Sequence, residues 1–271
     1  MKLKINRKTA IGVLAAGAAI MVFLEYFPVE FSTDETLNNI IRMTLTRGTG
    51  SLTFAILLLY MGFHVHRMSG IGRQLLFSLP CFAVVINNLP IIALATGAAQ
   101  VTAPAGHVVW FVFECIFIGI FEETVFRGII YLILLEKRRD STRQIFWTTV
   151  WSSAIFGGIH LINLLAGAGV GPTLLQMGYS FLIGGMCSVV LLKTRNIWLC
   201  ALLHAVYDVC GLMLPTLGEG SWWDTPTIIF TAVLAVAVTV YVVVALFRVT
   251  PASIAPIFED DTQKDSDRAV I

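Results

Sequence analysis

Residues 121–128 read FEETVFRG, and they place three charged side chains inside an otherwise apolar stretch. WFVFECIFIGI precedes them at 110–120, and IIYLILL follows at 129–135. An ionisable group at membrane depth costs free energy and usually faces a cavity or a charged partner. The two glutamates and the arginine therefore indicate a membrane helix that also carries a candidate site.

The whole composition agrees with a membrane protein. Of the 271 residues, 57% are hydrophobic and only 13% are charged, against about 25% charged residues in soluble domains. The net charge of +1 gives no indication of nucleic-acid binding. We predict an all-α, polytopic membrane protein of about eight transmembrane helices, with the site inside the helical bundle. The predicted spans are approximately 9–27, 50–66, 74–96, 105–135, 146–167, 173–192, 197–214 and 226–248.

The rest of the chain divides simply. We predict a membrane-embedded domain over 1–249 and a disordered cytoplasmic tail over 250–271, because EDDTQKDSD offers little that could pack. Segment 28–49 is too polar to span and is predicted to be a short amphipathic helix lying on the outer surface, with its role left open. The five cysteines fall in apolar spans without a CxxC pair, which is typical of buried thiols.

Basic residues occur in alternate loops, with the exception of segment 28–49, which has Arg42 and Arg47 beside three acidic residues. They follow the second, fourth and sixth predicted spans, whereas 97–104, 168–172 and 215–225 have none. The positive-inside rule therefore predicts a multi-pass protein of the cell membrane with both termini in the cytoplasm.

Spacing sorts the charged groups of the fourth predicted span. Glu123 and Arg127 are four residues apart, so they share a helix face and can form an ion pair. Glu122 lies about 100° around the helix from Glu123 and can point elsewhere, for example toward a water molecule. Glu114 lies about two turns before Glu122, and its role is left open.

Two later spans carry further ionisable groups. His204 and Asp208 share one face of the seventh predicted span, and Phe156 and His160 share one face of the fifth. The glycines of FGGIH allow close helix approach beside that histidine. Taken singly, these residues are more simply explained as helix-packing groups or structural ion pairs. Taken together, we expect Glu122, His160 and His204 to converge on one pocket.

Three motifs resemble a known family. EETVFR at 122–127, FGGIH at 156–160 and HAVYD at 204–208 occur in the order and separation of the CPBP family, which contains CAAX prenyl proteases and bacteriocin-processing Abi proteins. The resemblance covers about residues 75–215, the motif-bearing protease core. It implies an intramembrane endopeptidase, glutamate-dependent or a metalloprotease.

The resemblance also implies residue roles. Glu122 would activate the attacking water, and His160 would work with it. His204 and Asp208 would stabilise the oxyanion or help to hold the site. Eukaryotic relatives typically have asparagine where this chain has Asp208, which puts the oxyanion role of that residue in doubt, because an ionised carboxylate cannot donate a hydrogen bond.

Glu123 and Arg127 match the supporting ion pair of the first motif. The metal requirement stays open at this point. Glu122, His160 and His204 could ligate a divalent metal such as zinc with an open water position. No HExxH motif is present, so no cofactor is assigned, and a metal-free mechanism is slightly favoured.

The predicted partners are the lipid bilayer and a membrane-associated or secreted peptide substrate, with no nucleic acid. Whether the substrate is prenylated, and the oligomeric state, cannot be read from the sequence. Two other functions use the same residues. One is a non-catalytic membrane scaffold or bacteriocin-immunity protein, and the other is an ion-coupled transporter.

Overall fold

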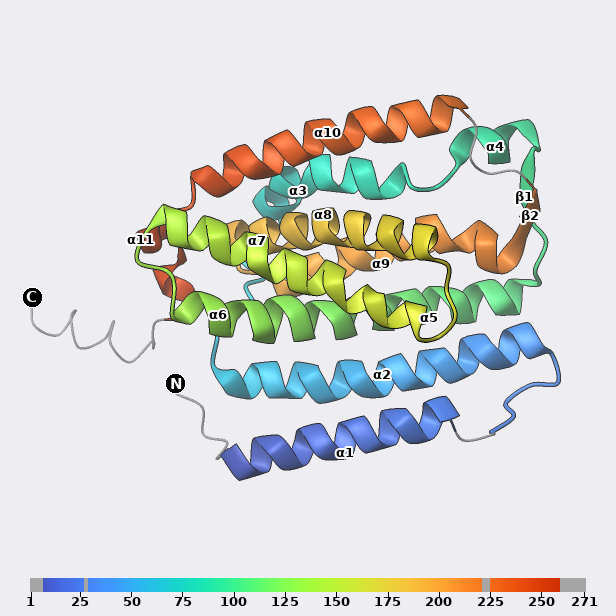
Figure 1. Ribbon diagram of the computed structural model, residues 1–271, viewed down its shortest axis with the longest axis horizontal. Coiled ribbons are helices and arrows are strands. Elements are labelled where there is room, and N and C mark those ends of the chain that lie inside the picture. The colour runs from blue at the N-terminus through green and yellow to red at the C-terminus, as the bar shows by residue number, and fades with distance from the viewer. Residues whose placement is uncertain (1–6, 27–28, 221–224, 259–271) are drawn as a thin grey trace, which may run out of the picture.

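The computed structural model describes residues 7–26, 29–220 and 225–258. Helices run side by side along the length of the molecule, with α1 and α2 on one side and α10 with α3 on the other (Figure 1). The elements are α1 Arg7–Tyr26, α2 Glu35–Met61, α3 Ile71–Ile86, α4 Ile91–Thr96, β1 Ala99–Val101, α5 Ala105–Glu123, π-helix η1 Thr124–Tyr131, α6 Leu132–Glu136, α7 Thr142–Gly158, 3-10 helix η2 Ile159–Leu164, α8 Val170–Thr194, α9 Ile197–Leu217, β2 Gly218–Gly220, α10 Thr225–Phe247, α11 Pro251–Ile254 and 3-10 helix η3 Ala255–Ile257.

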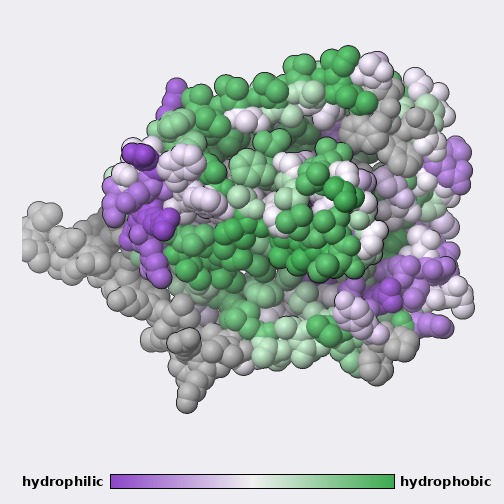
Figure 2. All heavy atoms as spheres, viewed as in Figure 1, coloured by the Kyte–Doolittle hydropathy of each residue, from purple (hydrophilic) through white to green (hydrophobic). Residues whose placement is uncertain are grey.

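The predicted all-α membrane fold is confirmed. Within the described residues, four helical segments are long and apolar enough to cross a membrane: Thr142–Leu164, Val170–Thr194, Ile197–Leu217 and Thr225–Phe247. Apolar side chains cover much of the molecule between polar groups gathered toward its two ends (Figure 2). The count of eight spans stays a prediction.

The two ends of the bundle differ. At one end β1 and β2 pair antiparallel, with Gln100 opposite Glu219 (Figure 1). At the other end, the basic loops gather around α11 and η3. Lys193 Nζ donates to the Arg248 carbonyl at 3.1 Å, and the Arg139 guanidinium lies 4.3 Å from the Phe258 ring centroid. The loops predicted to share one side of the membrane therefore do lie together.

Helix α2 corrects the prediction for segment 28–49. Residues from Glu35 onward belong to one helix that continues to Met61. Asp34 is its N-cap and accepts a hydrogen bond from the Leu37 N–H at 2.8 Å. That bond, together with His107 at 3.2 Å, holds the pKa of Asp34 below its usual range. The cap and the contact with α5 explain why this polar start is helical.

Two further predictions differ from the structure. The single span predicted over 74–96 is broken after Ile86, because Pro90 lacks an N–H and restricts the residue before it. The start of the predicted disordered tail is ordered: residues 251–257 are helical, and Ile254 and Ile257 are fully buried. The remainder, 259–271, lies outside the described residues, so the domain limits stay predictions.

Small residues let the helices of the site pack closely. A Cβ on Gly119 of α5 would lie 2.5 Å from the Ala201 carbonyl oxygen of α9. A Cβ on Gly157 of α7 would lie 2.7 Å from the Met177 carbonyl oxygen of α8. Gly157 is the first glycine of FGGIH, so the predicted close approach is confirmed there. Close packing of this kind holds membrane helices together where lipid removes the hydrophobic driving force.

Candidate active site

The site begins where α5 passes into the wider turn of η1. Glu123 ends α5, and Arg127 lies within η1. Arg127 Nη1 lies 2.9 Å from Glu123 Oε1, and both side chains are almost fully buried. The Thr124 hydroxyl donates to the carbonyls of Ile120 and Phe121 at 2.7 and 3.0 Å, where the helix changes its hydrogen-bond spacing. Short π segments of this kind are frequent at functional sites.

An aromatic ring and a glycine accommodate the Arg127 guanidinium. Its Cζ lies 4.0 Å from the ring centroid of Phe156, which is a cation–π distance. Gly184 of α8 leaves the necessary space, since a Cβ there would lie 3.0 Å from Arg127 Nη2. The guanidinium therefore pairs with Glu123, lies over the ring of Phe156 and fits against α8 at Gly184.

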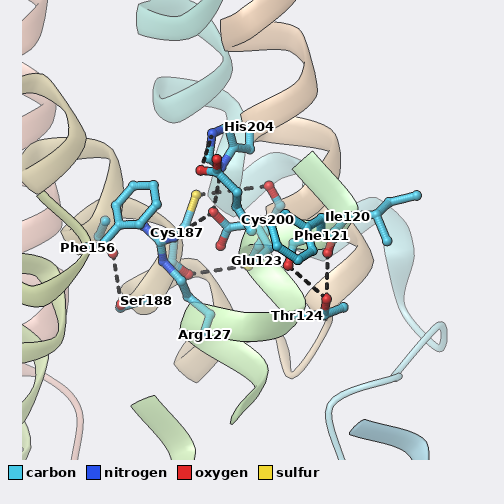
Figure 3. Close-up of polar contacts among 12 residues, drawn as sticks. Ile120, Phe121, Glu123, Thr124, Arg127, Phe156, Cys187, Ser188, Cys200 and His204 are labelled. Carbon is cyan, nitrogen blue, oxygen red and sulfur yellow. Dashed lines mark hydrogen bonds and ion pairs between the residues drawn. The ribbon is translucent and has the colours of Figure 1, made fainter. Parts of the chain in front are cut away.

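Glu123 has a second partner on another helix. His204 Nδ1, from α9, lies 2.7 Å from Glu123 Oε1, the oxygen that also faces Arg127 (Figure 3). A carboxylate only accepts hydrogen bonds, so Nδ1 of His204 is assigned the proton. The bond fixes the direction of the imidazole and turns its Nε2 away from Glu123.

Two more carboxylates lie near that second nitrogen. Glu122 Oε2 is 3.6 Å and Asp208 Oδ2 is 3.7 Å from His204 Nε2. Both separations exceed hydrogen-bond distance, so a water or a substrate oxygen could bridge them. The Glu122 side chain is 23% exposed, whereas that of Glu123 is fully buried. Glu122 is thus the accessible carboxylate and Glu123 the enclosed one.

These groups open onto a cavity of about 540 Å³. Four of the predicted site residues line it: Glu122, His160, His204 and Asp208. The supporting pair lies behind this lining. The predicted convergence on one pocket is therefore present in the structure, although the chemical roles stay predictions.

His160 shares the cavity but has a different anchor. It lies in η2, and its Nδ1 is 3.1 Å from the Phe156 carbonyl oxygen. A carbonyl only accepts, so Nδ1 is the donor and, in the neutral ring, Nε2 is left as an acceptor. The Phe156 ring stands nearly perpendicular to both His160 and His204, with centroids 5.6 and 5.8 Å away. Phe156 thereby spaces the two imidazoles.

The metal alternative concerns Glu122, His160 and His204, and it stays a prediction. Across the described parts of the chain, no group of three His, Cys, Asp or Glu side chains is placed to hold a metal ion. His204 and His160 each bond a protein acceptor through Nδ1, which leaves Nε2 free, as in most metal-ligating histidines. The chemistry proposed below uses the chain's own side chains.

Two features of the site were not predicted from the sequence. The first is the bond from His204 to Glu123, which crosses 81 residues. The second is the position of Phe156 between Arg127 and the two histidines. The five cysteines are free and buried, as expected.

Residues 104–210 match the family model of the Rce1-like type II CAAX prenyl endopeptidases. No curated protein and no solved structure matches the chain. The matched segment contains all three motifs and every residue of the site described above, and it confirms the resemblance to CAAX proteases. This part of the chain is thus similar to Rce1-like domains, and together with the membrane helices the match supports an intramembrane endopeptidase.

Proposed function

We propose that this protein hydrolyses peptide bonds of membrane-associated or secreted peptide substrates, with Glu122 as the general base. One observation carries the proposal. The accessible carboxylate of Glu122 lies 3.6 Å from an oriented imidazole nitrogen of His204 at the wall of a cavity. Peptide hydrolysis needs an activated water, a stabilised oxyanion and a proton for the leaving amine.

The steps follow from these positions. Glu122 takes a proton from a water molecule as the water oxygen bonds to the peptide carbonyl carbon. The oxyanion that forms accepts a hydrogen bond from Nε2–H of the His204 imidazolium. Glu122 then gives its proton to the amide nitrogen, the C–N bond breaks, and a carboxyl group and an amine leave.

The other two cavity residues assist. His160, with Nδ1–H on the Phe156 carbonyl, presents Nε2 as an acceptor that holds the attacking water. Asp208 is assigned a different role from the asparagine of eukaryotic relatives. Its carboxylate faces His204 Nε2 at 3.7 Å and favours the imidazolium form.

Glu123 and Arg127 are positioning residues. Glu123 orients His204 through Nδ1–H, and Arg127 offsets the charge of Glu123. A buried carboxylate without Arg127 would be costly to keep ionised. The pair therefore keeps Nδ1 of His204 protonated and holds the ring in one direction.

The substrate is proposed to reach the site from the membrane. A second cavity of about 360 Å³ lies between α3, α7, α8 and α10 and has a mainly apolar lining, which includes Val238 and Leu246. It shares five lining residues with the catalytic cavity: Asn88, Tyr179, Ile183, Tyr207 and Thr231. An apolar segment or attached lipid could lie there while the peptide bond lies beside Glu122.

The orientation is also a proposal. We place the end with α11 and the basic loops in the cytoplasm, as the positive-inside rule predicts. The gathering of these loops at one end supports this placement, with Lys193 bonded to the carbonyl of Arg248.

Purified protein in liposomes should cleave members of a library of prenylated and unmodified membrane peptides, detected by mass spectrometry as new termini. Solute uptake without cleavage would instead support the transporter. Comparing the peptides of deletion and wild-type cells would identify the substrate, and intact cellular function with Glu122→Gln would support the scaffold.

Metal removal provides a separate prediction. Since the donors of Glu122, His160 and His204 do not form a metal-binding group, dialysis against a chelator should leave the cleavage rate unchanged. The measurement is the rate before dialysis, after it, and after zinc is returned. Loss of activity that zinc restores would show that the metal alternative is correct.

A further inference from the structure

A polar cavity of about 580 Å³ lies apart from the catalytic one. Its lining consists of Phe63, His64, His66, Arg67, Ser69 and Arg195. The residues come from the loop after α2 and from the end of α8, close to the η3 segment, because the His64 N–H donates to the Ile257 carbonyl at 2.9 Å. This cavity therefore belongs to the end of the bundle with the basic loops.

Its two arginines have no carboxylate partner within the described residues. Arg67 Nε donates only to the Ser69 hydroxyl, at 3.1 Å. Burial and the neighbouring Arg67 guanidinium lower the pKa of Arg195. Two like charges that share a cavity repel each other, and a bound anion would remove this repulsion.

Backbone hydrogen bonds bring the segments that carry the two arginines together. The Arg67 N–H donates to the Arg195 carbonyl at 3.0 Å, and the Ile197 N–H donates to the Val65 carbonyl at 2.8 Å. Arg195 ends α8 with φ 55°, and it is the only non-glycine residue with positive φ among those described. Helices usually place glycine or asparagine at such an end. An arginine there occupies a backbone region that costs free energy for a residue with a Cβ.

A buried amide side chain fixes the loop. Gln74 Nε2 donates to the carbonyls of Arg67 and Ser69 at 3.1 and 3.0 Å. Gln74 Oε1 accepts from Asn196 Nδ2 at 2.8 Å, which ties the loop to the segment after α8. The cavity is thus preorganised without a ligand.

The two histidines have ring nitrogens without a partner, and one of those on His66 must be a donor. His64 Nε2 and both ring nitrogens of His66 are buried and have no hydrogen-bond partner within the described part of the chain. Every imidazole carries at least one N–H. Buried polar atoms without a partner are rare, and each one calls for an explanation.

We propose that this cavity binds a phosphate group, carried either by an anionic lipid headgroup or by a soluble phosphate compound. Two guanidinium groups, a hydroxyl and imidazole N–H donors match the oxygens of such a group. The positive-inside rule by itself explains basic residues in cytoplasmic loops, without any bound anion. Arg73 is such a basic loop residue, because it is exposed and lies outside the cavity lining.

The test uses the full chain in micelles of a phosphate-free maltoside detergent, with phosphatidic acid and inorganic phosphate as probes. Wild type should bind a phosphate probe, whereas Arg67→Gln/Arg195→Asn should bind it at least about tenfold more weakly. Asparagine keeps the left-handed backbone at position 195. Arg73→Gln is the matched control and should bind like wild type. If the double variant has a lower melting temperature than wild type, Arg67→Gln alone replaces it in the binding test, because the Arg67 side chain is exposed.

The two probes separate the sources. Binding of phosphatidic acid that inorganic phosphate does not displace supports a lipid headgroup, and binding of inorganic phosphate itself supports a soluble ligand. The proposal is overturned if neither probe binds, if Arg67→Gln binds like wild type, or if Arg73→Gln loses as much affinity as the cavity variants. Cleavage activity does not enter this test.

Discussion

Glu122→Gln should reduce peptide cleavage by about 10²- to 10⁴-fold, the usual contribution of a general base, while leaving the melting temperature unchanged. Glutamine keeps the volume and the hydrogen-bonding capacity of the side chain but cannot take a proton from water. The Glu122 side chain lines the cavity and has no short bond to protein, with His204 Nε2 at 3.6 Å. Its replacement therefore removes chemistry without leaving a buried charge unpaired.

Glu114→Gln is the matched control for this variant. Glu114 lies on the same helix about two turns away, and it lines a different cavity, of about 260 Å³, together with Thr36 and Asn39. The exchange is chemically identical, so it should retain cleavage. Equal loss in both variants would mean that any acid in α5 matters, for example along a proton path, and would favour the transporter.

Arg127→Ala should lower both activity and stability. The substitution leaves Glu123 buried without its cation, and breaking a buried pair costs about 3–5 kcal/mol in soluble proteins. For a chain of this size that corresponds to a fall in melting temperature of about 10 °C, or less where water reaches the charge within the membrane. Activity should fall because Glu123 would no longer hold His204 in one orientation.

A double variant separates the two effects of the pair. Glu123→Leu/Arg127→Met replaces both charges with apolar groups and should recover much of the stability. It should remain poorly active, since His204 Nδ1 loses its acceptor. If Arg127→Ala melts like wild type yet has no activity, Arg127 takes part in the chemistry, for instance by binding a substrate carboxylate, and the assignment as a positioning residue is wrong.

Spacing along one helix predicted part of the site. The interval of four residues gave the Glu123–Arg127 pair, and the rotation of about 100° per residue separated Glu122 from Glu123. The structure agrees on both points, since one carboxylate is enclosed and the other faces the cavity. Such periodicity reports which residues share a face of their own helix.

Contacts between helices could not be obtained in the same way. His204 reaches Glu123 rather than Glu122 with its short bond, and that choice depends on the rotation of α9 against α5. Gly119 allows α5 and α9 to lie close together, but a glycine in a membrane helix does not indicate which helix packs against it. The widening at Thr124–Tyr131 likewise has no compositional signal that distinguishes it from an ordinary α-helix.

The errors in the fold have local causes. The polar residues of segment 28–49 suggest a helix separate from the following span, whereas the helix capped by Asp34 continues without a break to Met61. Pro90 was available in the sequence as a helix breaker and explains the division of the third predicted span. The helix at 251–254 has a capping box formed by Thr250 and Ser253. The prediction of disorder rests on the acidic residues that follow this helix and does not take the capping box into account.

The most direct measurement of the central claim is peptide cleavage in heavy-oxygen water. Wild-type protein and Glu122→Gln would be incubated in liposomes with the same membrane peptide, and the products would be weighed by mass spectrometry. The account predicts that wild type forms a new C-terminal carboxylate carrying one heavy oxygen, because water is the nucleophile, and that Glu122→Gln forms almost none. Absence of cleavage by wild type, or equal amounts of labelled product from both proteins, would contradict it.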